Sequence, residues 1–134
     1  MSSAIRRNRT GFTLIEMLIV VVVIGILASV AVARFNRVKQ RGQMAAVQSD
    51  LRNISVAQEG YHMENMTYTN DPDDLEFDIT SGVIITITAA TSTGWAATGT
   101  HAGDATIQCG VFVGTATAAS APPATSPEVV ACSF

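Results

Sequence analysis

The stretch Arg9–Glu16, RTGFTLIE, joins a short basic leader to a long apolar run. The run, FTLIEMLIVVVVIGILASVAVA, occupies residues 12–33, which is 22 residues with Glu16 as the single charged position. At about 1.5 Å per residue, a helix of this length extends roughly 33 Å, enough to cross the hydrocarbon core of a bilayer. A simple membrane anchor explains the length of the run, but it does not explain a carboxylate five residues into it.

Charge is distributed unevenly along the chain. Three arginines precede the apolar run, all eight basic residues lie at or before Arg52, and nine of the eleven acidic residues follow it. The arginines predict that the N-terminal end stays in the cytoplasm while the rest of the chain lies outside. The segment after Arg52 contains no Lys or Arg, so we do not expect it to bind nucleic acid by neutralising phosphates.

The sequence Gly11–Glu16, placed between a basic leader and an apolar helix, resembles the processing site of type IV prepilins and pseudopilins. The resemblance implies that a prepilin peptidase in the membrane cuts after Gly11, that the new N-terminal residue Phe12 is N-methylated, and that Glu16 is needed for assembly. Removing residues 1–11 would leave five basic against eleven acidic residues, a formal charge of -6.

The competing interpretation of the N-terminus is an ordinary secretory signal peptide. The small residues at 31–33 fit its cleavage pattern, and the mature chain would then begin at Arg34. However, the apolar stretch is longer than the usual region of about 7–15 residues, and Glu16 would have no role. We therefore favour the prepilin interpretation.

A single helix is predicted to continue beyond the apolar run. Residues 34–41, RFNRVKQR, can place cationic groups at the outer membrane interface, or form a solvated helix face. Apolar positions then recur at helical spacing, which predicts one face packed on a head domain, with Gln48, Asp50, Arg52, Asn53 and Glu59 facing elsewhere. The apolar positions are Met44, Val47, Leu51, Ile54, Ala57 and Tyr61.

Proline is absent between Phe12 and Asp71, so an unbroken helix is expected. Many members of the family that the motif resembles carry a proline at the position of Ala33, where it kinks the helix. Without that proline, Gly25 is the candidate position for local opening of the helix, because glycine costs up to about 1 kcal/mol relative to alanine there.

The C-terminal part is predicted to form a small antiparallel sheet. A turn at 70–74 ends the helix, and strands are expected at 83–89, 94–101 and 105–114, with a possible edge strand at 128–133. The stretch 61–69 also resembles the junction of many pilins, where a helix with aromatic residues precedes an Asn-x-x-Tyr loop. The expected fold class is α+β, a long N-terminal helix packed against an antiparallel head of three or four strands.

These boundaries divide the chain into three parts: a removed leader (1–11), a long helix (12–64), and an acidic β head (65–134). Within the helix, residues 12–33 would span the membrane or form the filament core, and 34–64 would be amphipathic. Cys109 and Cys132 lie beyond the membrane segment and lack C-x-x-C spacing, which favours a disulfide in an oxidising compartment over two buried free thiols.

Residue patterns give little indication of catalysis or of a cofactor. His62 and His101 are the two histidines, and neither has the spacing of a metal site. The acidic turn around Asp71–Asp78 could offer oxygens to calcium, but it does not match the EF-hand pattern, and a solvated turn is favoured. We expect no enzymatic activity, no metal site and no cofactor.

The resemblance implies a structural role. The leading hypothesis is the major subunit of a type IV pilus, a homopolymer used in adhesion, twitching motility or DNA uptake. The precursor would sit in the cytoplasmic membrane, and an assembly ATPase with a membrane platform would drive extension of an extracellular filament. The alternatives are a pseudopilin of a type II secretion system and, less favoured, an exported soluble binding domain.

Overall fold

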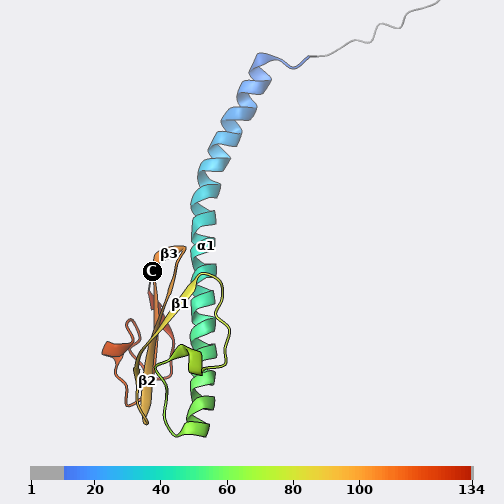
Figure 1. The fold of residues 1–134 in the computed structure, drawn as a ribbon. Coiled ribbons are helices and arrows are strands. Elements are labelled where there is room, and N and C mark those ends of the chain that lie inside the picture. Colours follow the sequence, from blue (N-terminus) through green and yellow to red (C-terminus); the bar gives the residue numbers. More distant parts are fainter. Residues whose placement is uncertain (1–10, 134) are drawn as a thin grey trace, which may run out of the picture. The chain divides into compact units, whose positions relative to one another are not determined.

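A computed structural model describes residues 11–133 (Figure 1). The expected leader cleavage concerns residues 1–11, of which 1–10 lie outside the described part. One helix, α1 (Leu14–Asn65), precedes a four-stranded antiparallel sheet of β1 (Val83–Ala90), β2 (Gly94–His101), β3 (Asp104–Gly114) and β4 (Ala131–Ser133). The strands lie in the order β1-β2-β3-β4. The predicted α+β class and its antiparallel sheet are therefore confirmed.

Helix α1 is divided between two compact units, and the boundary lies between Arg37 and Val38. The first unit contains the apolar run, and the second contains the rest of α1 together with the whole sheet. The helix continues through Gly25 and Ala33. The glycine therefore does not interrupt it, and no proline is present at position 33 to kink it. It begins two residues later than Phe12, because Thr13 caps its first turn.

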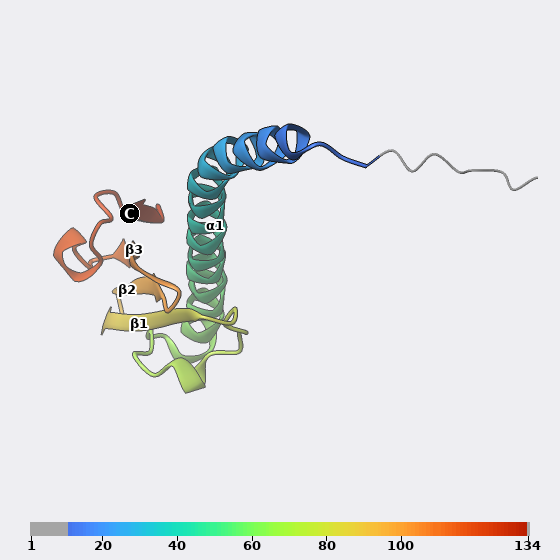
Figure 2. The same cartoon turned by 90° about the horizontal axis from the view of Figure 1, so that it is seen from above.

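The second half of α1 packs on one face of the sheet (Figure 2). Val47, Leu51 and Ile54 are fully buried, which confirms the predicted apolar stripe. Gly99 of β2 permits a close approach, since a Cβ there would lie only 2.6 Å from Val47 Cγ1. Opposite the helix, Trp95 of β2 is also fully buried and supplies the largest side chain of this core.

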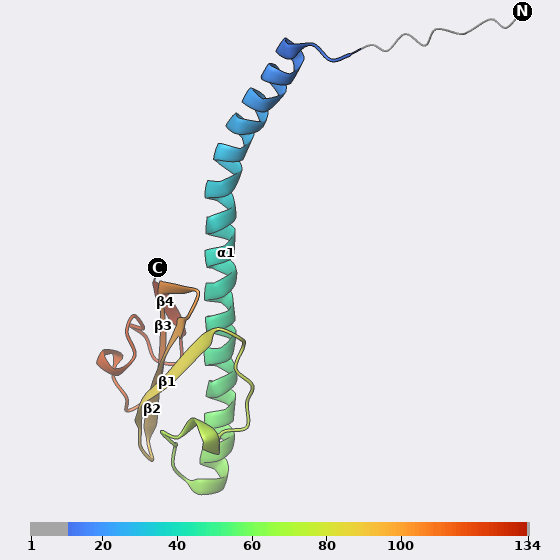
Figure 3. The same ribbon diagram turned by 45° about the horizontal axis from the view of Figure 1, so that its top comes forward.

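The segment between β3 and β4 covers part of the other face of the sheet (Figure 3). Ala121 and Ala124 from this segment are buried against Ala96 and Phe112. Gly110 of β3 lies directly under it, because a Cβ at this position would collide with the Ala121 carbonyl oxygen. Small side chains thus form a second small core on this face of the sheet.

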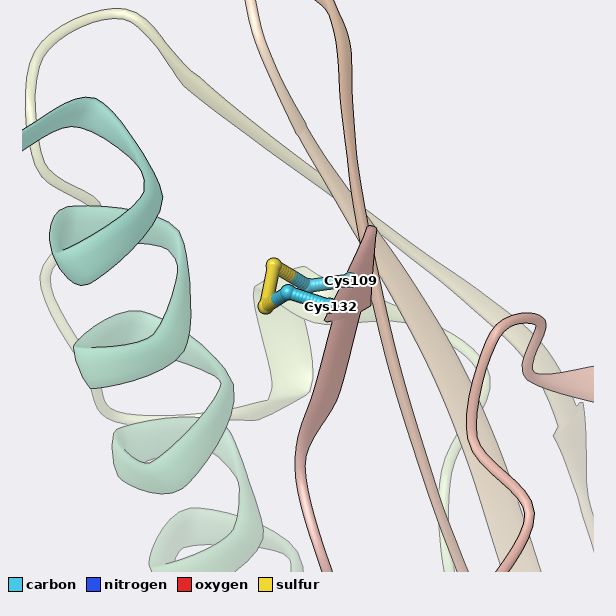
Figure 4. Close-up of a disulfide and its surroundings, with 2 residues drawn as sticks. All are labelled: Cys109 and Cys132. Carbon is cyan, nitrogen blue, oxygen red and sulfur yellow. A yellow bond between two sulfur atoms is a disulfide. The ribbon is translucent and has the colours of Figure 1, made fainter. Parts of the chain in front are cut away.

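Two short 3₁₀ helices complete the second unit. The first, η1 (Pro72–Asp74), lies in the predicted acidic turn, where Asp71 accepts a hydrogen bond from the Asp73 backbone N–H. The second, η2 (Ala118–Ser120), lies within the segment that covers the sheet. The cysteines pair directly across β3 and β4, and a disulfide joins them on the side of the sheet that faces α1 (Figure 4).

Candidate functional site

The start of α1 is a reciprocal capping box formed by Thr13 and Glu16. The Thr13 backbone N–H and hydroxyl each donate to Glu16 Oε2 at 2.8 Å. The Glu16 backbone N–H in turn lies 3.3 Å from Thr13 Oγ1, which accepts its hydrogen bond. This is the arrangement that a Thr-x-x-Glu sequence adopts at a helix N-terminus, because it satisfies backbone donors that have no partner inside the helix.

Capping fixes the position of the carboxylate. Glu16 is folded back toward Thr13 and accepts the N–H of the Phe12–Thr13 peptide. Among residues 11–133, Oε2 has two donors and no hydrogen bond is found to Oε1. One oxygen is therefore free to accept a cationic group from outside the chain.

Apolar side chains of the first unit are exposed from Phe12 to Val32 and at Phe35. Phe12 is 81% exposed, and the large apolar residues from Leu14 to Val32 are each about half exposed or more. The most apolar window of α1 has a mean hydropathy of 2.9, so the helix is long and apolar enough to cross a membrane. Exposing each such side chain to water costs about 1.5–3 kcal/mol, so this surface needs lipid or protein around it.

Polar side chains on α1 attach the connecting loops of the head. Asp50 is 2% exposed and accepts hydrogen bonds from the Thr80 N–H at 2.7 Å and from its hydroxyl at 2.9 Å. Gln58 is fully buried and pairs through both amide atoms with the backbone of Thr69. The prediction that Asp50 faces away from the head is therefore wrong: it lies three residues after Val47, on the buried face.

The end of α1 is joined to the next loop by aromatic and polar contacts. The rings of His62 and Tyr68 stack with their centroids 4.4 Å apart, and His62 Nε2 lies 3.0 Å from the Ser92 carbonyl oxygen. Tyr68 donates its hydroxyl to Glu59. Partial burial, with the nearby Glu59 carboxylate, raises the pKa of Tyr68 above its usual value. This side-chain network occupies the predicted Asn-x-x-Tyr junction.

Neither histidine takes part in a cluster of metal-binding side chains within the described residues. His101 Nδ1 accepts a hydrogen bond from the Gly103 N–H in the turn between β2 and β3. In the same turn, Asp104 accepts hydrogen bonds from Thr106 and from Gln40 of α1. The Thr106 hydrogen bonds lower the pKa of Asp104 below its usual value.

Comparison with known proteins identifies the N-terminal motif. Residues 6–32 match the family model described as the prokaryotic N-terminal methylation motif. The chain is 34% identical over 71 residues to the type II secretion system core protein G of Pseudomonas aeruginosa. It is 37% identical over 71 residues to a type IV major pilin protein of Myxococcus xanthus. Over about half of its length, the chain is thus similar to type IV pilins and to type II secretion core proteins.

The similarity to these pilins and secretion proteins covers part of each chain. The alignments include 53% of this chain, and 50% of the Pseudomonas protein or 32% of the Myxococcus pilin. The type IV wide pilus major component of Thermus thermophilus is 38% identical over 65 residues, which cover 48% of this chain and 50% of that protein. The chain thus spans about half the length, or less, of the curated relatives it matches.

Proposed function

We propose that this chain is the subunit of a helical, type IV pilus-like filament, which polymerises through α1 after cleavage between Gly11 and Phe12. The observation that carries the proposal is an exposed apolar first half of α1 that begins with a capped carboxylate inside a methylation motif. Its role is structural rather than catalytic. The relatives are named as pilins and as secretion core proteins.

Cleavage would create the partner that Glu16 lacks. The α-amino group of Phe12, N-methylated after processing, has an ordinary pKa near 8 and is mainly cationic at neutral pH. Two unit charges about 4 Å apart attract by about 4 kcal/mol at an effective dielectric constant of 20. That attraction offsets the cost of about 2.5–3.5 kcal/mol for a carboxylate within the membrane. Glu16 of an incoming subunit would therefore pair with Phe12 of its neighbour.

Pairing of this kind selects one axial register. In any other register, Glu16 of the subunit would be unpaired in apolar surroundings. The free-energy cost of that unpaired charge exceeds the stabilisation that the pair contributes. The capping box supports this role, because Thr13 holds Oε2 and directs the carboxylate toward the start of the helix. Gly25 remains our candidate for local opening of α1 in the filament.

The apolar run would have two environments. In the cytoplasmic membrane, acyl chains surround the helix of the single-pass precursor, so little free energy drives helices together. In the filament, neighbouring helices would cover the same side chains, because exposing these apolar side chains to water is unfavourable. Transfer between the two states requires an external motor, which we assign to an assembly ATPase acting through a membrane platform.

Shearing intact cells tests the proposal. We expect long extracellular filaments made of this chain, with N-methylated Phe12 as the N-terminal residue by mass spectrometry. A mature chain beginning at Arg34, or one secreted as a soluble monomer, would overturn it. Filaments would serve adhesion, twitching motility or DNA uptake.

A pseudopilin of a type II secretion system is the second candidate. The similarity to the core protein G of Pseudomonas aeruginosa and of Vibrio cholerae favours it, at 34% identity in each case. Processing at Gly11 and assembly through Glu16 would be the same. Sheared fractions would then lack the chain, which would remain in short filaments within the envelope.

A further inference from the structure

A groove lies between the last turns of α1 and η1. Its volume is about 300 Å³, and it is lined by residues from one helix face and from the acidic turn. These residues are Ala57, Gly60, Tyr61, Glu64, Asp74, Leu75 and Glu76. We call it the acidic groove, because its lining includes three carboxylates beside the apolar, buried Leu75.

The head that carries this groove has no cation of its own. Residues 53–134 contain neither Lys nor Arg. The nearest basic residue along α1 is Arg52, which lies 12 positions before Glu64, or about 18 Å at the helical rise. The groove is therefore not neutralised by its own chain.

Basic residues of the chain are concentrated near the middle of the same helix. Arg34, Arg37, Lys39 and Arg41, which we call the basic neck, are all exposed. The sequence contains no acidic residue between Glu16 and Asp50, so the neck has no carboxylate at helical i+3 or i+4 spacing. Asp50 itself is buried and already accepts two hydrogen bonds from Thr80.

We propose that the acidic groove of one subunit binds the basic neck of a second copy in the filament. The inference rests on the proposed polymerisation of this chain. A subunit cannot fill its own groove with its own neck, because Lys39 lies 25 residues before Glu64, about 38 Å along α1. The occupant comes from a neighbour displaced along the filament axis by about that distance.

Gly60 supports an occupied groove. It lies inside a helix, where glycine is up to about 1 kcal/mol less favourable than alanine. Apart from its chain neighbours and the backbone of its own helix turns, no atom of the described structure lies within 4 Å of the place where its Cβ would be, so packing within the subunit does not require a glycine. Its missing side chain leaves room in the groove for the aliphatic part of a Lys or Arg side chain, while the carboxylates meet the charge.

Zero-length crosslinking of sheared filaments tests this contact, because Lys39 is the one lysine in the sequence. A carbodiimide joins an amine to a carboxylate only when the two are in contact. We expect an isopeptide bond between Lys39 and Glu64, Asp74 or Glu76, found in a covalent dimer. The Lys39→Arg variant should form filaments without this bond.

Charge-conserving variants extend the test to the rest of the neck. In the Lys39→Arg background, Arg34→Lys, Arg37→Lys and Arg41→Lys each place a single amine at another neck position. At least one of the four amines should link to a groove carboxylate. If filaments form and none of the four does so, the inference is wrong while the proposed function stands. If the wild-type chain forms no filaments, both fail.

Substitutions in the groove give a second measurement. The double variant Glu64→Gln/Glu76→Gln should lower the yield of sheared filaments roughly tenfold, equivalent to about 1.4 kcal/mol. The matched control Asp73→Asn/Asp78→Asn removes two exposed carboxylates of the same region that do not line the groove. Gly60→Leu should also lower the yield without destabilising the head. Equal yields from the groove and control variants would contradict the proposal.

Discussion

The disulfide between Cys109 and Cys132 is predicted to hold the last strand on the sheet. It closes a loop with a sequence separation of 23 residues, and β4 has only three residues paired with β3. In the chain-entropy model, such a crosslink lowers the free energy of the folded state relative to the unfolded chain by about 3.4 kcal/mol. Three strand residues alone contribute far less, so β4 should depend on the crosslink.

The double variant Cys109→Ala/Cys132→Ala tests this magnitude. Both buried clusters lie within residues 38–134, so urea unfolding of that fragment reports on the whole core. With a slope of about 1–3 kcal/mol per molar urea, the midpoint should fall by roughly 1–3 M. A loss below about 1 kcal/mol would refute the entropic argument.

Reduction provides the matched control for this variant. Wild-type fragment treated with a thiol reductant should unfold at the same urea concentration as the double variant, and the variant itself should not respond to the reductant. Amide hydrogen exchange should show faster exchange in β4 and in the preceding segment, with β2 unchanged until global unfolding.

Three further substitutions test the attachment and packing of the head. Asp50→Ala should lower the free energy of unfolding by about 1.5–3 kcal/mol, because Thr80 loses a charged acceptor; urea unfolding would reveal it, and an unchanged midpoint would contradict it. Leu51→Ala should cost about 2–5 kcal/mol by the same assay, since the side chain is fully buried; a cost under 1 kcal/mol would mean that the core closes around the cavity. Thr106→Ala should raise the pKa of Asp104 toward its usual value in an NMR titration. Because its pKa is lowered in the folded state, ionised Asp104 stabilises the fold at pH values above its usual pKa, and this stabilisation is lost as the pH falls through the lowered pKa. Identical titrations of the variant and the wild type would exclude the Thr106 contribution.

Periodicity in the sequence predicts the helix and the sheet but not the polar contacts between them. The spacing of Val47, Leu51 and Ile54 indicates the buried face, and the alternation of β-branched residues indicates β1. The buried state of Asp50 depends on Thr80, which lies 30 residues later in an irregular loop. Local patterns contain no information about such a partner.

The covering segment between β3 and β4 illustrates a second limit. Its alanines, prolines and serines have the composition of an exposed loop, yet Ala121 is fully buried. The cause is Gly110, which lacks a side chain on the outer face of the sheet and admits the Ala121 carbonyl. Close packing between backbone segments has no signature in hydrophobic periodicity.

At the N-terminus, the sequence indicated the importance of Glu16, and the structure adds the contribution of Thr13. The Thr-x-x-Glu spacing could have revealed the capping box without coordinates. It matters because the helix cap and the proposed assembly role then depend on the same side chain. Experiments on Glu16 must separate these two roles.

The most direct measurement of the central claim is the yield of sheared filaments from cells that make Glu16→Gln or Glu16→Ala. The glutamine can still cap the helix but carries no charge, whereas the alanine removes both the cap and the charge. If Glu16 pairs with the amino group of Phe12, both variants should be cleaved after Gly11 and inserted in the membrane, yet give few filaments. Wild-type filament yield from the correctly processed Glu16→Gln chain would contradict the account.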